Sequence, residues 1–149
     1  MKRTFLLPAI ILLAACDKAV EVDLAAAPPG AIKQGVDLMS TYCQTCHGVG
    51  KFEIDEMLAP PLWAVRAHYL GAYPEPEAFV DAMAAFIIEP QQETSRMPLA
   101  VADYGLKAPI SMDEEKIRAV VWAIYAGQVE KPSWSRDYEK RHRDCEAVW

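Results

Sequence analysis

One short motif, Cys43-Gln44-Thr45-Cys46-His47, constrains this chain more than any other part of its sequence. Two cysteines separated by two residues and followed directly by a histidine form the attachment motif of c-type haem. Held on one short loop, the two thiols can add to the two vinyl groups along one edge of a porphyrin. The histidine can then bind the iron through the outer nitrogen of its imidazole. The motif predicts one covalently attached haem c, with Cys43 and Cys46 as attachment points and His47 as an iron ligand.

Two other kinds of site use closely spaced cysteines. A zinc knuckle needs two further ligands, and the chain contains no second C-x-x-C pair and no H-x-x-x-H pair. A thioredoxin-like redox pair lies at a strand-to-helix junction of an alternating strand–helix chain, whereas the apolar pattern here is helical. Haem attachment is therefore the favoured interpretation.

The first 15 residues have the features of a secretory signal peptide. Lys2 and Arg3 supply the positive start, and the apolar stretch from Phe5 to Leu13 is far too short to span a membrane. The segment ends Leu13-Ala14-Ala15-Cys16, which resembles the lipobox of bacterial lipoproteins. The resemblance implies cleavage before Cys16 and attachment of acyl chains to that cysteine. The alternative is ordinary signal cleavage, which leaves Cys16 as a plain residue.

The lipoprotein resemblance also predicts where the protein resides. Asp17, directly after the lipidated cysteine, resembles the signal that retains lipoproteins in the inner membrane. We expect the protein on the periplasmic side of the bacterial inner membrane, held by several acyl chains because one chain alone binds only marginally. Residues 16–30 are rich in alanine and end in Pro28-Pro29-Gly30, so we expect a lipidated, flexible tether.

Charge excludes one class of partner. The chain carries a formal net charge of −6, and loss of Lys2 and Arg3 with the signal peptide lowers it to −8. Such an acidic chain is unsuited to binding nucleic acid or anionic lipid headgroups. After cleavage, the remaining chain has the length of one domain.

The pattern of apolar residues predicts an all-α domain over residues 31–127. Two helices are expected at 31–42 and 63–69. A third is expected to begin in the Pro74–Glu77 segment and to end just before Pro90. A fourth is expected to begin at a capping box of Ser111 and Glu114 and to end at Gly127. Residues 91–110 are expected to form a long irregular connection, and connections of that length usually carry function. Residues 59–61, with two prolines, are expected to be extended.

This order resembles class I cytochrome c: a helix entering C-x-x-C-H, then loops, a middle helix, a methionine loop and a last helix. The resemblance covers Ala31 to Gly127. It implies that the first and last helices cross around one haem. In this chain the crossing would place residues of the first helix (Gly35, Met39 and Tyr42) against residues of the last helix (Val121, Trp122 and Tyr125).

The resemblance also assigns roles after the motif. Pro60-Pro61-Leu62 looks like the G-P-x-L element of the family, with Ala59 in place of the glycine. It implies that the Pro60 carbonyl accepts a hydrogen bond from the inner nitrogen of His47 and so fixes the ring. It also implies that Leu62 packs on the haem face.

Met97 is the predicted sixth ligand of the iron. It lies in the expected irregular connection, and Pro98 restricts its backbone to extended geometry, so the thioether is expected to project from a stiff backbone. It also occupies the position where the resembled family carries its methionine. The other methionines fall on helical apolar stripes, close after the haem loop or in a first helical turn, where packing is the usual role. His68 and an open coordination position are the two alternatives.

Residues 128–149 extend beyond the resembled core. Trp134, Tyr138, Cys145 and Val148 recur at helical spacing, so a charged helix is expected to lay one face on the domain. The sequence assigns this extension no role.

The expected function is the transfer of single electrons outside the cytoplasmic membrane, with redox proteins as donor and acceptor. A six-coordinate iron has no open position for substrate, so no catalytic residue is predicted. Two alternatives stay open. One is a permanent haem subunit of a respiratory oxidoreductase complex, and the other is a haem-based redox or gas sensor with a displaceable sixth ligand.

Overall fold

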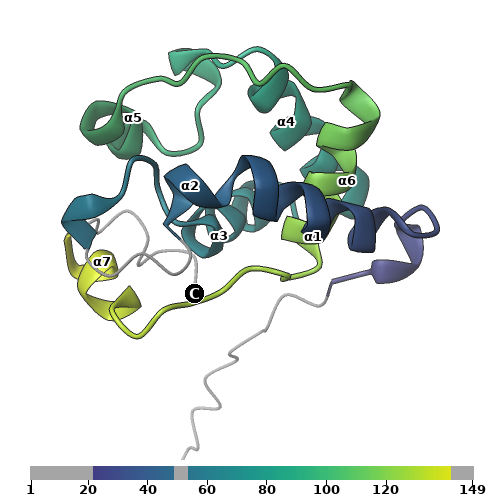
Figure 1. Ribbon diagram of the computed structural model, residues 1–149, viewed down its shortest axis with the longest axis horizontal. Coiled ribbons are helices and arrows are strands. Elements are labelled where there is room, and N and C mark those ends of the chain that lie inside the picture. Colours follow the sequence, from purple (N-terminus) through teal and green to yellow (C-terminus); the bar gives the residue numbers. More distant parts are fainter. Residues whose placement is uncertain (1–21, 49–53, 142–149) are drawn as a thin grey trace, which may run out of the picture.

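The computed structural model describes residues 22–48 and 54–141, and within these ranges every regular element is helical (Figure 1). The predicted all-α class is confirmed. The helices are α1 (Ala31–Tyr42), α2 (Gln44–His47), α3 (Leu62–Ala72), α4 (Pro76–Ile88), α5 (Pro98–Tyr104), α6 (Glu114–Tyr125) and α7 (Ser135–Arg141). Three 3₁₀ turns join them, η1 (Leu24–Ala26), η2 (Ile54–Glu56) and η3 (Gln92–Thr94). In the part of the chain described, no helix has both the length and the apolar character needed to cross a membrane.

Helices α1 and α6 form the central crossing of the domain, as Figure 1 shows. Gly35 lies at the contact point, where a Cβ atom added to it would be only 1.9 Å from the carbonyl oxygen of Ala119. The predicted crossing at Gly35 is confirmed, because only a residue without a side chain lets the two backbones touch.

The partners of Gly35 differ from those that the resemblance implied. Gly35 faces Ala119 and Ala123 of α6, since small side chains are needed where two helices touch. Trp122 and Tyr125 are buried beside this contact in the main core. Tyr42, at the end of α1, is 51% exposed and therefore lies at the edge of the crossing and not inside it.

The main core lies between α4 and α6. Phe79 of α4 packs edge-on against Tyr125 of α6 at 5.1 Å between ring centroids, and against Tyr69 of α3 at 5.9 Å. Helix α6 ends as predicted: Gly127 adopts φ +78°, and the N–H groups of Gly127 and Gln128 donate to the carbonyls of Ile124 and Ala123. These two bonds satisfy the last carbonyls of the helix.

Two predicted boundaries are wrong. The N-cap of α6 is Asp113, not Ser111, and no side chain closes a capping box there. The Asp113 carboxylate instead pairs with the Lys116 ammonium at 2.6 Å. Residues 91–110 are not irregular throughout, because η3 and α5 lie within them. Helix α5 begins at Pro98, which is tolerated at a first helical position because its missing N–H is not needed there.

The chain from Val22 onward is not the free tether that composition suggested. Val22, Ala26 and Ala27 pack against the main core. The N–H of Asp23 donates to the Tyr125 hydroxyl at 3.2 Å, and the Asp23 carboxylate accepts from the N–H of Ala25 at 2.9 Å. Apolar side chains and a local cap therefore fix this segment to the domain. Cys16 and the rest of the predicted tether lie outside the described residues, as do the signal peptide, Cys145 and Val148.

Candidate haem site

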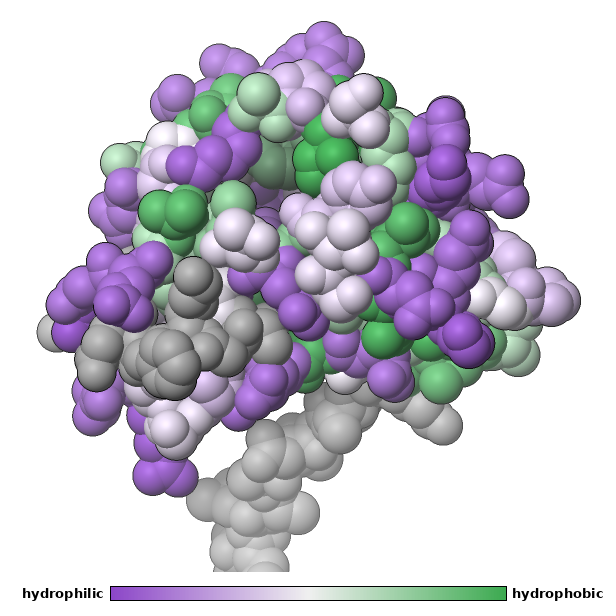
Figure 2. All heavy atoms as spheres, viewed as in Figure 1, coloured by the Kyte–Doolittle hydropathy of each residue, from purple (hydrophilic) through white to green (hydrophobic). Residues whose placement is uncertain are grey.

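A large apolar cavity opens among α2, α3, α4, α5 and α6. The space between its walls is about 1000 Å³, part of it open to solvent. Its walls are mainly aliphatic and aromatic side chains. In the view of Figure 2, hydrophobic residues gather around a hollow in the upper part of the molecule. Such a cavity accepts a large, mostly apolar group.

His47 stands at the end of α2 and lines this cavity. Its Nδ1 atom lies 2.5 Å from the carbonyl oxygen of Pro60. A carbonyl can only accept a hydrogen bond, so Nδ1 carries the proton and Nε2 keeps a free lone pair. The hydrogen bond that the resemblance implied is therefore present.

The electrostatics of His47 favour the neutral ring that a metal needs. Burial lowers the pKa of His47, and the nearby Lys107 ammonium lowers it further. The hydrogen bond to Pro60 acts in the opposite direction, since it stabilises the protonated form. The balance leaves the pKa below its ordinary value, so the ring is unprotonated and able to ligate at neutral pH.

The backbone around His47 is fixed on both sides. Gly48 ends α2 with φ +71°, and a Cβ atom there would lie 2.9 Å from the Met57 side chain. The N–H of Leu58 donates to the Cys46 carbonyl at 3.3 Å. These contacts bring the segment that holds Pro60 back against the motif, so Met57 serves packing rather than ligation.

Cys43 and Cys46 are both free, half-buried thiols. Cys43 caps the end of α1 and lines the cavity, whereas Cys46 lies on the short helix α2. Burial, assisted by the charge of Cys46, raises the pKa of the Cys43 thiol to about 11. Cys43 is therefore protonated at neutral pH. Cys43 is thus the cysteine of the motif that the structure places at the cavity wall, and Cys46 is not among the described lining residues.

Met97 lines the same cavity as His47 and is only 6% exposed. It is the N-cap of α5, and its backbone angles, φ −131° and ψ 69°, are not the extended geometry predicted from Pro98. Its N–H donates to the Ser95 hydroxyl at 3.1 Å. Pro98 and this hydrogen bond fix the backbone from which the thioether projects. The structure thus brings His47 and Met97, 50 residues apart in the chain, to one cavity.

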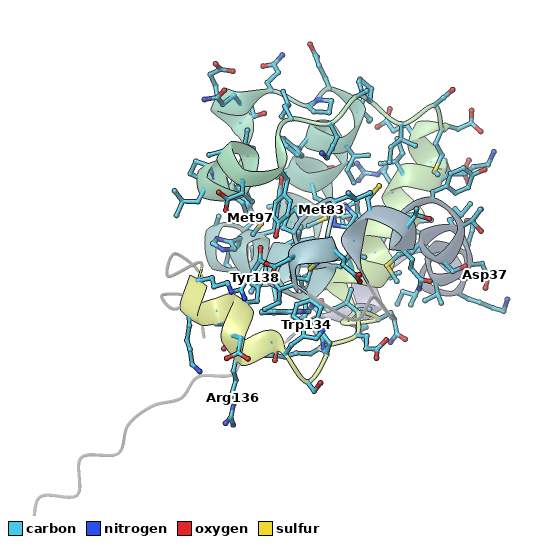
Figure 3. All side chains as sticks on the ribbon, turned by 60° about the vertical axis from the view of Figure 1, so that its left-hand side comes forward. Asp37, Met83, Met97, Trp134, Arg136 and Tyr138 are labelled. Atoms are coloured by element: carbon cyan, nitrogen blue, oxygen red, sulfur yellow. The ribbon has the colours of Figure 1, made fainter. Side chains whose placement is uncertain are left out.

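A second thioether also faces the cavity. Met83 of α4 is 2% exposed and lies among its lining residues (Figure 3). The sequence placed Met83 on a helical stripe, and helical periodicity alone does not separate a core position from a cavity wall. His68 of α3, the alternative ligand, is half-buried and does not belong to the wall formed by the described residues.

The Pro60–Leu62 segment has the geometry that its prolines predict. Residues 59–61 are outside any helix, and Pro61 is extended with φ −62° and ψ 142°. Leu62 begins α3, is buried and lines the cavity. Ala59 is buried, and no residue other than glycine has positive φ within the described ranges. The position therefore does not require the glycine that the resembled family carries.

The charged side chains at the cavity wall are basic, whereas the chain as a whole carries a negative net charge. Arg96 and Lys107 are the basic side chains among its described lining residues, and no acidic side chain is among them. The Arg96 guanidinium lies 5.1 Å from the centre of the Tyr73 ring, and the Lys107 ammonium donates to the Tyr104 carbonyl at 2.5 Å. Sequence reasoning missed Arg96, because its position at the cavity depends on how residues 91–97 fold.

The described residues contain no group of three or more histidine, cysteine or acidic side chains that could hold a metal ion by themselves. The zinc interpretation of the motif therefore gains no further ligands from them. Comparison of the chain with models of protein families, with curated proteins and with solved structures gives no match. The interpretation of the site rests on its own residues.

Proposed function

We propose that this protein is a monohaem c-type cytochrome of class I type that transfers single electrons. The observation that carries the proposal is one apolar cavity lined by both His47 and Met97, with Cys43 of the C-x-x-C-H motif at its edge. This combination offers an imidazole, a thioether and a thiol to one large apolar group. A haem is the group that uses all three.

The residues present fit a haem. Cys43 and Cys46 would hold its edge covalently, while Nε2 of His47 would bind the iron with its ring oriented by Pro60. Met97 would supply a second ligand to the iron, and Leu62 would pack against the haem. Arg96 and Lys107 would face the two carboxylates that a haem carries, in a cavity without acidic side chains.

The chemistry that a bound haem supplies is the reversible one-electron change between ferric and ferrous iron. The protein's residues set how easily that change occurs. A neutral thioether favours ferrous iron, and an apolar wall disfavours the extra charge of ferric iron, so both raise the reduction potential. With both axial positions filled, the protein would carry electrons rather than bind substrate.

The experiment that tests this function is a potentiometric titration of the purified protein, followed by carbon monoxide. We expect a single one-electron transition with a low-spin spectrum in both states and little reaction of the ferrous protein with carbon monoxide. A sensor would instead bind carbon monoxide readily at an open or easily displaced position. Rapid carbon monoxide binding by the native ferrous protein would contradict electron transfer as its function.

We further propose that acyl chains on Cys16 hold the protein at the periplasmic face of the inner membrane, where redox proteins serve as donor and acceptor. The lipobox-like sequence before Cys16 supports this proposal. Membrane fractionation tests it: Cys16→Ser protein should be released in soluble form or retain its uncleaved signal peptide. A cleaved Cys16→Ser protein that stays in the membrane fraction as fully as wild type would show that Cys16 is not the anchor.

A further inference from the structure

Helix α7, in the segment to which the sequence assigns no role, is built into the body of the protein. Tyr138 is 0% exposed, and its ring packs edge-on against Trp63 of α3 with 5.6 Å between the ring centroids. Trp134 packs behind it at 6.5 Å. Figure 3 shows Tyr138 directed from α7 into the body, whereas Arg136 of the same helix points away from it.

The cluster that receives Tyr138 is the one that contains Met97. Trp63, Ala64, Met97, Ala100 and Tyr138 form one packed group, separate from the main core between α4 and α6. This group therefore joins three elements: the N-terminal end of α3, the start of α5 and the extension. Met97 therefore belongs to the same packed group as Tyr138 of the extension.

Helix α5 is tied to α7 at its other end as well. Tyr104, the last residue of α5, packs against the same group that contains Tyr138. Tyr104 also lines the cavity. One side chain of the extension thus contacts the element that begins directly after Met97 and ends at the cavity wall.

Ionic contacts hold the extension in place. Arg141 at the end of α7 pairs with Asp55 of η2 at 2.6 Å. Lys131, in the connection before α7, pairs with Glu139 at 2.9 Å and lies 4.9 Å from the centre of the Trp63 ring. Exposed ion pairs contribute little energy individually, so the buried tyrosine carries most of the attachment.

We propose that α7 is a brace for the axial methionine and that Tyr138 is a positioning residue, which acts through Trp63 and Tyr104 to keep the Met97 thioether on the iron. This inference rests on the proposed function. Helix α5 has seven residues, and a helix of that length is not stable by itself, so packing fixes its place. A thioether is a weak ligand, so a small loss of packing around α5 increases the fraction of molecules in which the sulfur is off the iron.

The test measures that fraction with imidazole added to the ferric, haem-loaded full-length protein. Imidazole binds only where the sulfur has left, so its apparent affinity rises in proportion to the open fraction. Tyr138→Leu should tighten imidazole binding about tenfold, which corresponds to ~1.4 kcal/mol. Tyr138→Phe keeps the ring and loses only the hydroxyl, so it should restore most of the wild-type affinity.

Two control variants separate bracing from general destabilisation. Phe79→Leu removes an aromatic ring that is also 0% exposed, but it belongs to the main core and is not itself among the described lining residues. It should lower stability in urea and leave imidazole binding within about twofold of wild type. Arg136→Ala, on the exposed face of α7, should change neither quantity.

If Tyr138→Leu protein does not accumulate, a milder substitution in the same packed group tests the brace. Trp134→Leu removes a half-buried ring behind Tyr138 and should tighten imidazole binding about threefold. If haem-loaded Tyr138→Leu protein binds imidazole with wild-type affinity, α7 is not a brace for Met97. If Tyr138→Leu protein does not accumulate, wild-type imidazole affinity in Trp134→Leu overturns the brace in the same way. Either result leaves the proposed function standing. A wild-type protein that carries no haem would instead contradict the proposed function, so the two failures are distinguishable.

Discussion

A single hydrogen bond at His47 decides which nitrogen of the ring is available. The Pro60 carbonyl holds the proton on Nδ1, and burial keeps the ring neutral, so Nε2 is left as a ligand. Met97 reaches the same cavity from a backbone fixed by Ser95 and Pro98. At the scale of residues, the site is a neutral imidazole and a thioether held by backbone contacts at one cavity.

Substitutions at Met97 should change the iron in two distinct ways. Met97→His should keep six-coordination but lower the reduction potential, because imidazole donates more strongly and stabilises ferric iron; axial ligands cover about 0.8 V in all. Met97→Ala should open the iron to water and to carbon monoxide. Potentiometric titration and absorption spectra of both variants measure these effects.

Met83 supplies the matched control, since it lines the same cavity and its replacement by leucine conserves volume. Met83→Leu should keep the low-spin spectrum and the potential of wild type. Loss of the low-spin spectrum in Met83→Leu, with Met97→Ala unchanged, would move the axial ligand from Met97 to Met83.

At the scale of elements, the crossing of α1 and α6 depends on Gly35. A methyl group at this position would lie 1.9 Å from the Ala119 carbonyl oxygen, so Gly35→Ala must push the two helices apart. The gain in helix propensity, about 0.5–1 kcal/mol, is smaller than the cost of overpacking at about 1–3 kcal/mol or more. We therefore expect a net loss in the free energy of unfolding, measured by urea denaturation of the haem-loaded protein.

The neighbouring position gives the control for this crossing. Gln34 is exposed on the same helix, so Gln34→Ala should change the free energy of unfolding by less than about 0.5 kcal/mol. Equal stability of Gly35→Ala and Gln34→Ala would show that the two backbones are not in contact at this point.

Sequence reasoning predicted the elements that have a strong periodic pattern. The bounds of α1 and the stop of α6 at Gly127 are as predicted, because an apolar stripe and a positive-φ glycine are local signals. Helix α5 was missed, since seven residues after Pro98 show too little periodicity. The capping box at Ser111 failed because Asp113, two residues later, is the N-cap.

At the site, too, only the residues with a local sequence signal could be predicted. The C-x-x-C-H motif and Met97-Pro98 are local, so Cys43, His47 and Met97 could be named before any fold was known. Arg96 and Met83 could not be assigned to the cavity, because their places depend on long-range packing. Tyr138 was predicted to face the domain, but its place in the group of Met97 depends on how α7 packs. The docking of Val22 to Ala27 on the core was hidden by an alanine-rich composition that resembles a linker.

At the scale of the whole molecule, charge and apolar surface are unevenly distributed. The chain is acidic, with a formal charge of −6, yet the wall of its large apolar cavity carries Arg96 and Lys107 and no acidic side chain among the described residues. Residues of both packed clusters line the cavity, among them Leu62 and Met83 of the main core, and Met97 and Ala100 of the Met97–Tyr138 group. This arrangement suits an apolar ring with anionic substituents.

The measurement that tests this account most directly is the haem content of the denatured protein. The full-length chain is expressed with a cytochrome c maturation system, unfolded in acid and extracted with organic solvent. We predict that one haem per chain stays attached, and that Cys43→Ala/Cys46→Ala protein retains none. A wild-type chain without covalent haem, or haem retained in the absence of both cysteines, would contradict the account.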